Sequence, residues 1–243
     1  MSFNQPSVSS AVKNQYLYKL KGYSSVFVAL MTVQIIAMFF GVLGGVGQYG
    51  TSNGSMYLDL YYVSGDLIFA FTCIWAFVIA FTMDSKTNRQ AMQVFVTNQL
   101  TRHLANGIYL VTLSIIGAIT VLLGGFFIKS IVMILNGPES TFIFVGYTIG
   151  DFFIGLATTS LYLLLCSAVG YFAGKIASMG LVAKLVLIIG FLSVLFYNGL
   201  IERISEFFIM EDVFSIFILK VLVTSLVAYV MAIWLSKQLE VIK

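Results

Sequence analysis

The residue types that carry catalysis are scarce in this chain and are not spaced for it. His103 is the single histidine, and the two cysteines, Cys73 and Cys166, sit inside apolar runs. No cysteine or acid lies at a spacing from His103 that would make a metal site or a nucleophile–base pair. We therefore expect His103 to be a boundary residue at a helix end and the cysteines to be packing residues. We expect no enzymatic activity and no metal ion in this chain.

Nucleotide binding is not predicted either. A P-loop requires the spacing GxxxxGK[ST], whose backbone N–H groups surround the phosphates. The nearest sequence, GYFAGK at 170–175, lacks that spacing. Any ATP-driven process would therefore need ATP and Mg²⁺ bound by a separate ATPase chain. Nothing in the sequence predicts a nucleic-acid partner.

Four ionisable residues fall within apolar stretches: Asp66, Lys129, Asp151 and Lys220. Such side chains are costly in lipid, so each should face protein or water. Lys129 and Asp151 flank one tight turn at heights that differ by only about 6 Å. For this pair we favour a structural ion pair over a polar lining of a transport path. For Asp66 and Lys220 the two interpretations stay equal.

The elements that carry these residues are membrane helices. Hydrophobic residues make up 60% of the 243 residues and charged residues 9%, whereas soluble domains have about 25% charged residues. A soluble core could not bury so much apolar surface, and a transmembrane barrel would alternate instead of showing continuous apolar runs. We predict a single all-α transmembrane domain over residues 1–243. Its six transmembrane helices are expected at about 24–47, 60–83, 104–135, 142–172, 181–200 and 213–235.

Two shorter segments have amphipathic character. In 11–23, Val12, Tyr16 and Leu20 recur at helical spacing while the lysines fall elsewhere. This pattern predicts a basic helix lying in the headgroup plane, with an ordinary positive flank of the first span as the alternative. Residues 200–212 mix acids with apolar residues, which predicts short amphipathic helices or, alternatively, a simple loop.

The placement of lysine and arginine predicts the orientation. Six spans put both termini on one side, and that side holds Lys13, Lys19, Lys21, Lys86, Arg89, Arg102, Lys175, Lys184, Lys237 and Lys243. The opposite side holds Arg203 and most of the acids: Asp59, Glu139, Glu202, Glu206, Glu211 and Asp212. It also holds the polar loop expected at 48–59. Both termini are therefore predicted to be cytoplasmic.

The longest polar interruption between two spans, residues 84–103, falls on the cytoplasmic side of this topology. Asp84 or Ser85 can cap a helix start, because a short oxygen side chain accepts hydrogen bonds from the unpaired N–H groups there. The following residues are compatible with a helix, and Met92 and Phe95 contribute to one apolar face. Taken alone, the segment is also compatible with a solvated loop.

The order of these segments resembles the permease subunits of type-2 ATP-binding-cassette (ABC) exporters. The resemblance rests on AVKNQYLYKLKGY at 11–23, MDSKTNRQAMQVFVTNQLTRHL at 83–104 and LIERISEFFIMED at 200–212. It covers nearly the whole chain but is architectural, without a catalytic motif. The chain looks most like small permeases of Gram-positive bacteria, several of which serve peptide export or self-protection against antimicrobial peptides.

The resemblance implies a multi-pass protein of the bacterial plasma membrane. Two permease chains, identical or homologous, would enclose a path for an amphipathic substrate, a peptide or a lipid-like molecule. Two ABC ATPase subunits would bind ATP and Mg²⁺ and dock on a coupling helix. The docking residues it implies are Asp84, Ser85, Lys86, Thr87, Asn88, Arg89, Gln90 and Gln93.

Two alternatives to the exporter subunit remain. A proton-coupled secondary transporter would also use buried acids, but such carriers usually have internal repeats and helices broken at the midplane, and neither is evident here. A non-transporting membrane accessory protein would need no path at all.

Overall fold

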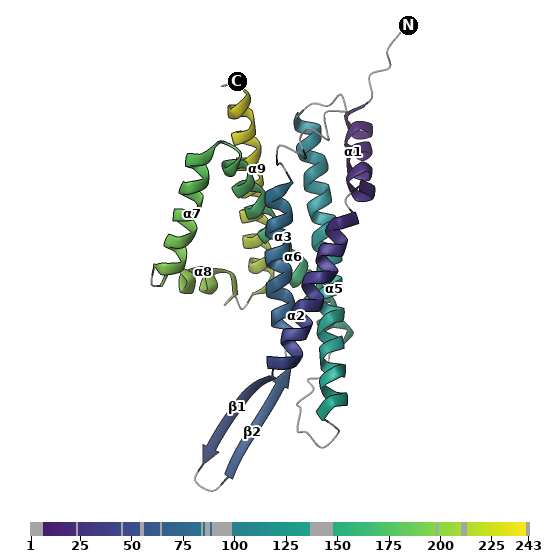
Figure 1. Cartoon of the computed structure of the whole chain (residues 1–243), viewed down its shortest axis with the longest axis vertical. Helices are drawn as coiled ribbons and strands as arrows, with labels where there is room; N and C mark the ends of the chain where they lie inside the picture. Colours follow the sequence, from purple (N-terminus) through teal and green to yellow (C-terminus); the bar gives the residue numbers. More distant parts are fainter. Residues whose placement is uncertain are drawn as a thin grey trace. The chain divides into compact units, whose positions relative to one another are not determined.

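The computed structural model describes residues 7–22, 24–44, 46–53, 56–63, 65–83, 85, 88, 99–136, 148–197, 199–209 and 213–241. These residues form long helices and one two-stranded hairpin (Figure 1). The helices are α1 (Val8–Gly22), α2 (Ser24–Gly44), α3 (Asp66–Thr82), α5 (Gln99–Asn136), α6 (Ile149–Ala177), α7 (Leu181–Phe196), α8 (Leu200–Ile209) and α9 (Phe214–Val241).

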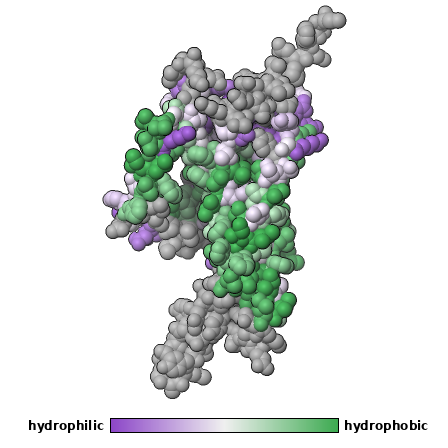
Figure 2. All heavy atoms as spheres, in the orientation of Figure 1, coloured by the Kyte–Doolittle hydropathy of each residue, from purple (hydrophilic) through white to green (hydrophobic). Residues whose placement is uncertain are grey.

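Among the described residues, four helices are long and apolar enough to cross a membrane: α2, α5, α6 and α9. Figure 2 shows hydrophobic residues over most of the visible surface of the described helices. The chain is therefore a helical membrane protein, as predicted. Helices α3 and α7 match the predicted second and fifth spans but have only 17 and 16 residues. At ~1.5 Å per residue they measure about 26 and 24 Å, somewhat short of a ~30 Å hydrocarbon core.

The predicted loop at 48–59 is instead part of a β-hairpin. Strand β1 (Val46–Asn53) pairs antiparallel with β2 (Met56–Val63), in a register that runs from Val46↔Val63 to Asn53↔Met56. Since β2 takes up residues 60–63, the second apolar helix begins at Asp66 rather than at residue 60. Strand β2 contains three tyrosines and a valine, residue types that favour strands over helices, and this explains the difference.

Two other boundaries also differ from the prediction. Helix α5 begins at Gln99 rather than at residue 104 and runs for 38 residues, about 57 Å at ~1.5 Å per residue. His103 therefore lies inside a helix. Helix α6 continues to Ala177 rather than stopping at residue 172. The predicted start of the fourth span, 142–147, lies outside the described residues.

The described chain divides into two compact units, and α3, α5 and α6 each contribute residues to both. Unit 2 comprises Ser25–Trp75 and Ile115–Ser160. Its core includes Ala37, Ile68, Val121, Ile128 and Val132. Here Gln34 Nε2 donates hydrogen bonds to Thr72 Oγ1 at 3.2 Å and to Thr120 Oγ1 at 2.9 Å, so that one buried amide links α2, α3 and α5.

Unit 1 comprises Met1–Ser24, Ala76–Ser114 and Leu161–Lys243. In this unit α6 packs closely on α3 through two glycines four residues apart. A Cβ atom on Gly170 would collide with the carbonyl oxygen of Phe77, and one on Gly174 would collide with that of Phe81. Only glycine permits this approach, which is the small-xxx-small packing common between membrane helices. The contact holds the C-terminal half of α3 against α6.

Candidate functional site

The segment implied as the ATPase-docking helix is described only at Ser85 and Asn88. The remaining docking residues lie outside the described residues: Asp84, Lys86, Thr87, Arg89, Gln90 and Gln93. The docking role of the whole set stays a prediction.

The two described residues terminate α3 and begin the next turn. The N–H of Ser85 and Nδ2 of Asn88 both donate to the Thr82 carbonyl, at 3.0 and 2.9 Å. The N–H of Asn88 donates in turn to Ser85 Oγ at 3.4 Å. Ser85 Oγ thus accepts from the backbone N–H three residues ahead, which is the contact that a capping side chain makes. The helix expected after it lies outside the described residues. Ser85 and Asn88 are therefore bonded directly to the last turn of α3.

Asp151 stabilises a helix terminus. Its Oδ2 accepts from the N–H and the hydroxyl of Thr148 at 3.0 and 2.7 Å, and its own N–H donates to Thr148 Oγ1 at 3.2 Å. This reciprocal pattern is a capping box at the start of α6. The carboxylate is thus engaged by the start of α6, and the expected ion pair with Lys129 stays a prediction.

The other three charges of this group lie on different helices, α3, α5 and α9, and their part in a transport path stays a prediction. Asp66 is exposed in the first turn of α3, where a negative charge complements the helix dipole. Lys129 is half-buried near the end of α5. Lys220 Nζ lies 4.5 Å from the centre of the Phe207 ring and 3.4 Å from the Phe207 carbonyl oxygen, and so links α9 to α8. That geometry favours a structural role for Lys220.

The most concentrated polar chemistry lies in unit 1, around the first two turns of α5. We call this group the α5 polar cluster. All of its members are buried except the half-buried Tyr229, although they come from apolar helices or from α1. The cluster consists of Gln15, Lys19, Thr101, His103, Asn106, Tyr171, Lys175, Tyr229 and Ser236.

Asn106 and the Tyr171 hydroxyl form the centre of the cluster. Lys19 Nζ donates a short hydrogen bond to Asn106 Oδ1, and Asn106 Nδ2 donates to the Tyr171 hydroxyl at 2.9 Å. That hydroxyl lies 2.7 Å from His103 Nδ1. Either atom can be the donor in this contact, depending on the tautomer of His103. A continuous hydrogen-bonded chain therefore runs from α1 through α5 to α6.

Helix α9 joins the same cluster from another side. The Tyr229 hydroxyl donates a short hydrogen bond to the His103 carbonyl, and its ring stacks on that of Tyr171 with centroids 5.2 Å apart. Lys175 lies 5.8 Å from the centre of the Tyr171 ring and donates to Ser236 Oγ at 3.2 Å. The glycine at 107 makes room for Tyr229, since a Cβ there would lie 3.0 Å from its hydroxyl oxygen.

The cluster connects four helices, α1, α5, α6 and α9, through buried side chains. Polar side chains buried among membrane helices hydrogen-bond to one another and thereby fix how the helices pack. Among the described residues there is no group of histidines, cysteines and acids that could hold a metal ion. The cluster attaches α1 to α5, and joins α5 to α6 and α9.

Sequence reasoning missed this cluster. His103 was expected at a boundary, Lys19 on the exposed face of an amphipathic helix, and Lys175 among the cytoplasmic flanking charges. All three are at most 2% exposed. The sequence carries one signal for the cluster, which is the helical spacing of its polar residues. Gln15 and Lys19 are four residues apart and share a helix face, and so do Tyr171 and Lys175.

Comparison with protein-family models, with curated proteins and with solved structures finds no match to this chain.

Proposed function

We propose that the chain is the transmembrane subunit of an ATP-driven ABC exporter in a bacterial cell membrane. With a second permease chain it would form the path for an amphipathic substrate, a peptide or a lipid-like molecule. ATP would be hydrolysed by separate ATPase subunits docked on residues 84–93. The proposal rests on the sequence resemblance together with the contacts that hold the two flanking helices, α3 and α5.

The contacts that hold the helices on either side of this segment are the observation that carries the proposal. On the N-terminal side, α3 is locked on α6 by Gly170 and Gly174, and its last turn is bonded to Ser85 and Asn88. On the C-terminal side, the first two turns of α5 are held by the α5 polar cluster. A segment that receives force from a motor must pass it to the helices on either side, and contacts that hold α3 and α5 in their unit support this role. Residues 89–98, which join the segment to α5, lie outside the described residues.

Helix α1 would reinforce the same end of the protein. Gln15 Nε2 donates to Thr101 Oγ1 at 3.5 Å, and Tyr16 and Thr112 share a hydrogen bond of 3.2 Å. Together with Lys19 and Asn106, these contacts fasten α1 along the start of α5. In the proposed complex α1 would lie at the cytoplasmic membrane surface and flank the ATPase contact.

We further propose that α3 and α7 complete a six-span topology with both termini cytoplasmic. Helix α7 would then provide a surface for the second permease chain. None of its described side chains is buried, and Leu181, Phe191 and Phe196 are 75%, 65% and 81% exposed. Such an apolar helix is typical of a surface covered by lipid or by another chain.

Co-purification tests the proposal. The tagged chain, extracted from its native membrane in mild detergent, should retain an ATPase with P-loop and ABC signature motifs, identified by mass spectrometry. The double variant Arg89→Glu, Gln90→Glu should lose this partner. Lys237→Glu, a matched charge reversal on the exposed end of α9, should keep it. Equal recovery with all three proteins, or no such ATPase with the unsubstituted chain, would refute the docking claim.

A proton-coupled carrier is the second candidate, because the α5 polar cluster places the titratable His103 between membrane helices. The two candidates differ in their energy source. Transport in sealed vesicles that continues without ATP but stops when the proton gradient is collapsed would favour the carrier.

A further inference from the structure

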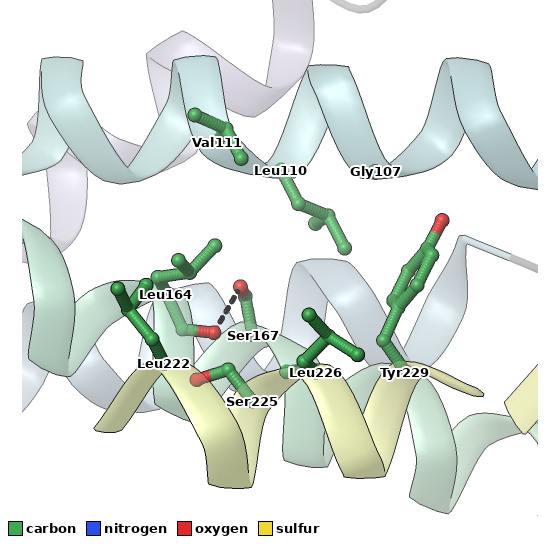
Figure 3. Close-up of a pocket in the computed structure, with 10 residues that line it drawn as sticks. Gly107, Leu110, Val111, Leu164, Ser167, Leu222, Ser225, Leu226 and Tyr229 are labelled. Carbon is green, nitrogen blue, oxygen red and sulfur yellow. Dashed lines mark hydrogen bonds between the residues drawn. The ribbon is translucent and has the colours of Figure 1, made fainter. Parts of the chain in front are cut away.

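An apolar pocket of about 320 Å³ opens between α5, α6 and α9 within unit 1. Its lining residues point toward one another from the three helices (Figure 3). They are Gly107, Leu110, Val111, Leu164, Ser167, Ala168, Leu222, Ser225, Leu226 and Tyr229. The volume lies at the lower end of the range of roughly 300–1,000 Å³ found for ligand sites.

The polar atoms that line this pocket are already engaged. The hydroxyl of Ser167 donates to the Leu164 carbonyl at 2.8 Å, and that of Ser225 donates to the Val221 carbonyl at 2.7 Å. The Tyr229 hydroxyl donates to the His103 carbonyl. Each hydroxyl proton is thus used within the protein, and the pocket offers a ligand little besides hydrocarbon. Its occupant must therefore be apolar.

The pocket has a buried floor and an exposed rim. Leu110 and Ala168 on the floor are 2% and 4% exposed, whereas Leu222 and Leu226 on the rim are 44% and 64% exposed. All three lining helices are long and apolar enough to span a membrane. The rim therefore opens toward the medium around membrane-spanning helices, which is lipid hydrocarbon. An empty pocket would deprive its lining atoms of dispersion contacts that a hydrocarbon chain restores.

We propose that this pocket is a binding site for one acyl chain of a bilayer lipid, inserted between α5, α6 and α9. The acyl chain enters past Leu222 and Leu226 and reaches Leu110 and Ala168. Tyr229 closes one side of the site and connects it to the α5 polar cluster through its hydrogen bond to His103. This site does not depend on the proposed exporter function, because it requires only that these three helices lie in a bilayer.

Photolabelling tests the proposal. The whole protein is reconstituted in vesicles of phosphatidylethanolamine and phosphatidylglycerol with a phosphatidylcholine that carries a diazirine in its acyl chain. After irradiation, peptide mass spectrometry locates the adducts. Leu110 and Ala168 should be labelled several-fold more than Leu163 and Ala173, which are also buried but do not line the pocket.

A substitution that fills the pocket provides a second test. Ala168→Phe should remove the adduct at Leu110, while labelling of Val223, which is 53% exposed outside the pocket, should persist as a control for folding and insertion. Leu226→Trp narrows the entrance at an exposed position and should lower the same adduct if Ala168→Phe does not fold.

The proposal is overturned if Leu110 and Ala168 are labelled no more strongly than Leu163 and Ala173, because no acyl chain then enters the pocket. If Leu226→Cys also forms disulfide-linked dimers in that case, a second copy of the protein fills the pocket.

Discussion

Tyr171 carries more of the interactions in the α5 polar cluster than any other single side chain described above. It is fully buried, bonds to His103 and Asn106, stacks on Tyr229 and lies beneath Lys175. Buried hydrogen bonds of this kind are costly to leave unmade, because the remaining partners cannot turn to water. We therefore expect the Tyr171 hydroxyl to contribute measurably to the stability of the folded protein.

Tyr171→Phe tests this directly. The substitution keeps the ring and its stacking but removes the hydroxyl, leaving His103 Nδ1 and Asn106 Nδ2 without that contact. We expect a loss of about 1–3 kcal/mol of stability, measured by denaturant unfolding in detergent micelles. Tyr197→Phe, at a position 67% exposed, is the matched control and should change little. Equal stability of both variants would show that the hydroxyl does not stabilise the cluster.

Lys19 offers a second test at the residue scale, because its amine attaches α1 to Asn106. Lys19→Met keeps the apolar stem and removes the donor. Amide hydrogen exchange in α1 should then accelerate by roughly 5–150-fold, the equivalent of about 1–3 kcal/mol. Lys21→Met removes an exposed lysine from the same helix and should leave the exchange unchanged. If both variants behave alike, α1 is held by other contacts.

The burial of His103, Lys19 and Lys175 could not be predicted from a charge count. Such a count places every lysine near an aqueous edge, since an isolated charge in lipid is costly. Which face of a helix meets its neighbour is decided by packing across the whole unit. In this unit that packing surrounds each of these three side chains with hydrogen-bond partners or aromatic rings.

At the scale of elements, the close approach of α3 and α6 depends on glycine. The atoms that a new Cβ at Gly170 would meet belong to the backbone of Phe77, which cannot rotate away. The same is true of Gly174 and Phe81. The two helices would have to separate to accommodate any side chain there.

Gly170→Ala should therefore destabilise the protein by about 1–3 kcal/mol, since inserted atoms force a backbone shift. The matched control is Gly190→Ala on α7, where nothing lies within 4 Å of the new methyl group. That substitution should be neutral or stabilising by up to about 1 kcal/mol, because alanine has the higher helix propensity. Thermal unfolding of the two variants side by side measures the difference. A neutral Gly170→Ala would contradict the close packing.

Most of the helices were predictable from the sequence, whereas the hairpin was not. Long apolar runs in lipid must satisfy their own backbone hydrogen bonds, so α2, α5, α6 and α9 follow from composition alone. The last four residues of β2, 60–63, are apolar and lie only two residues before α3, so the sequence predicts that the apolar span includes them. The signal for a hairpin was Gly54 as the first of the two residues between paired Asn53 and Met56, a position that favours a tight hairpin turn.

At the scale of the whole molecule, the proposed six-span topology can be tested by labelling. In a background without Cys73 and Cys166, single cysteines replace the exposed residues Ser9, Arg203 and Lys237. A maleimide that cannot cross membranes should label position 203 in intact cells, and positions 9 and 237 only after the membrane is opened. If either terminal position is labelled in intact cells, the proposed orientation is wrong.

The central claim is that an ATPase docks on the segment that begins at Ser85, and crosslinking in living cells tests it most directly. A photo-crosslinking amino acid at the exposed Ser85, activated by light, should capture one protein partner. The account predicts an ABC ATPase, with no such product from the same amino acid at Val223. Capture of only other classes of protein, or of no protein, would contradict it.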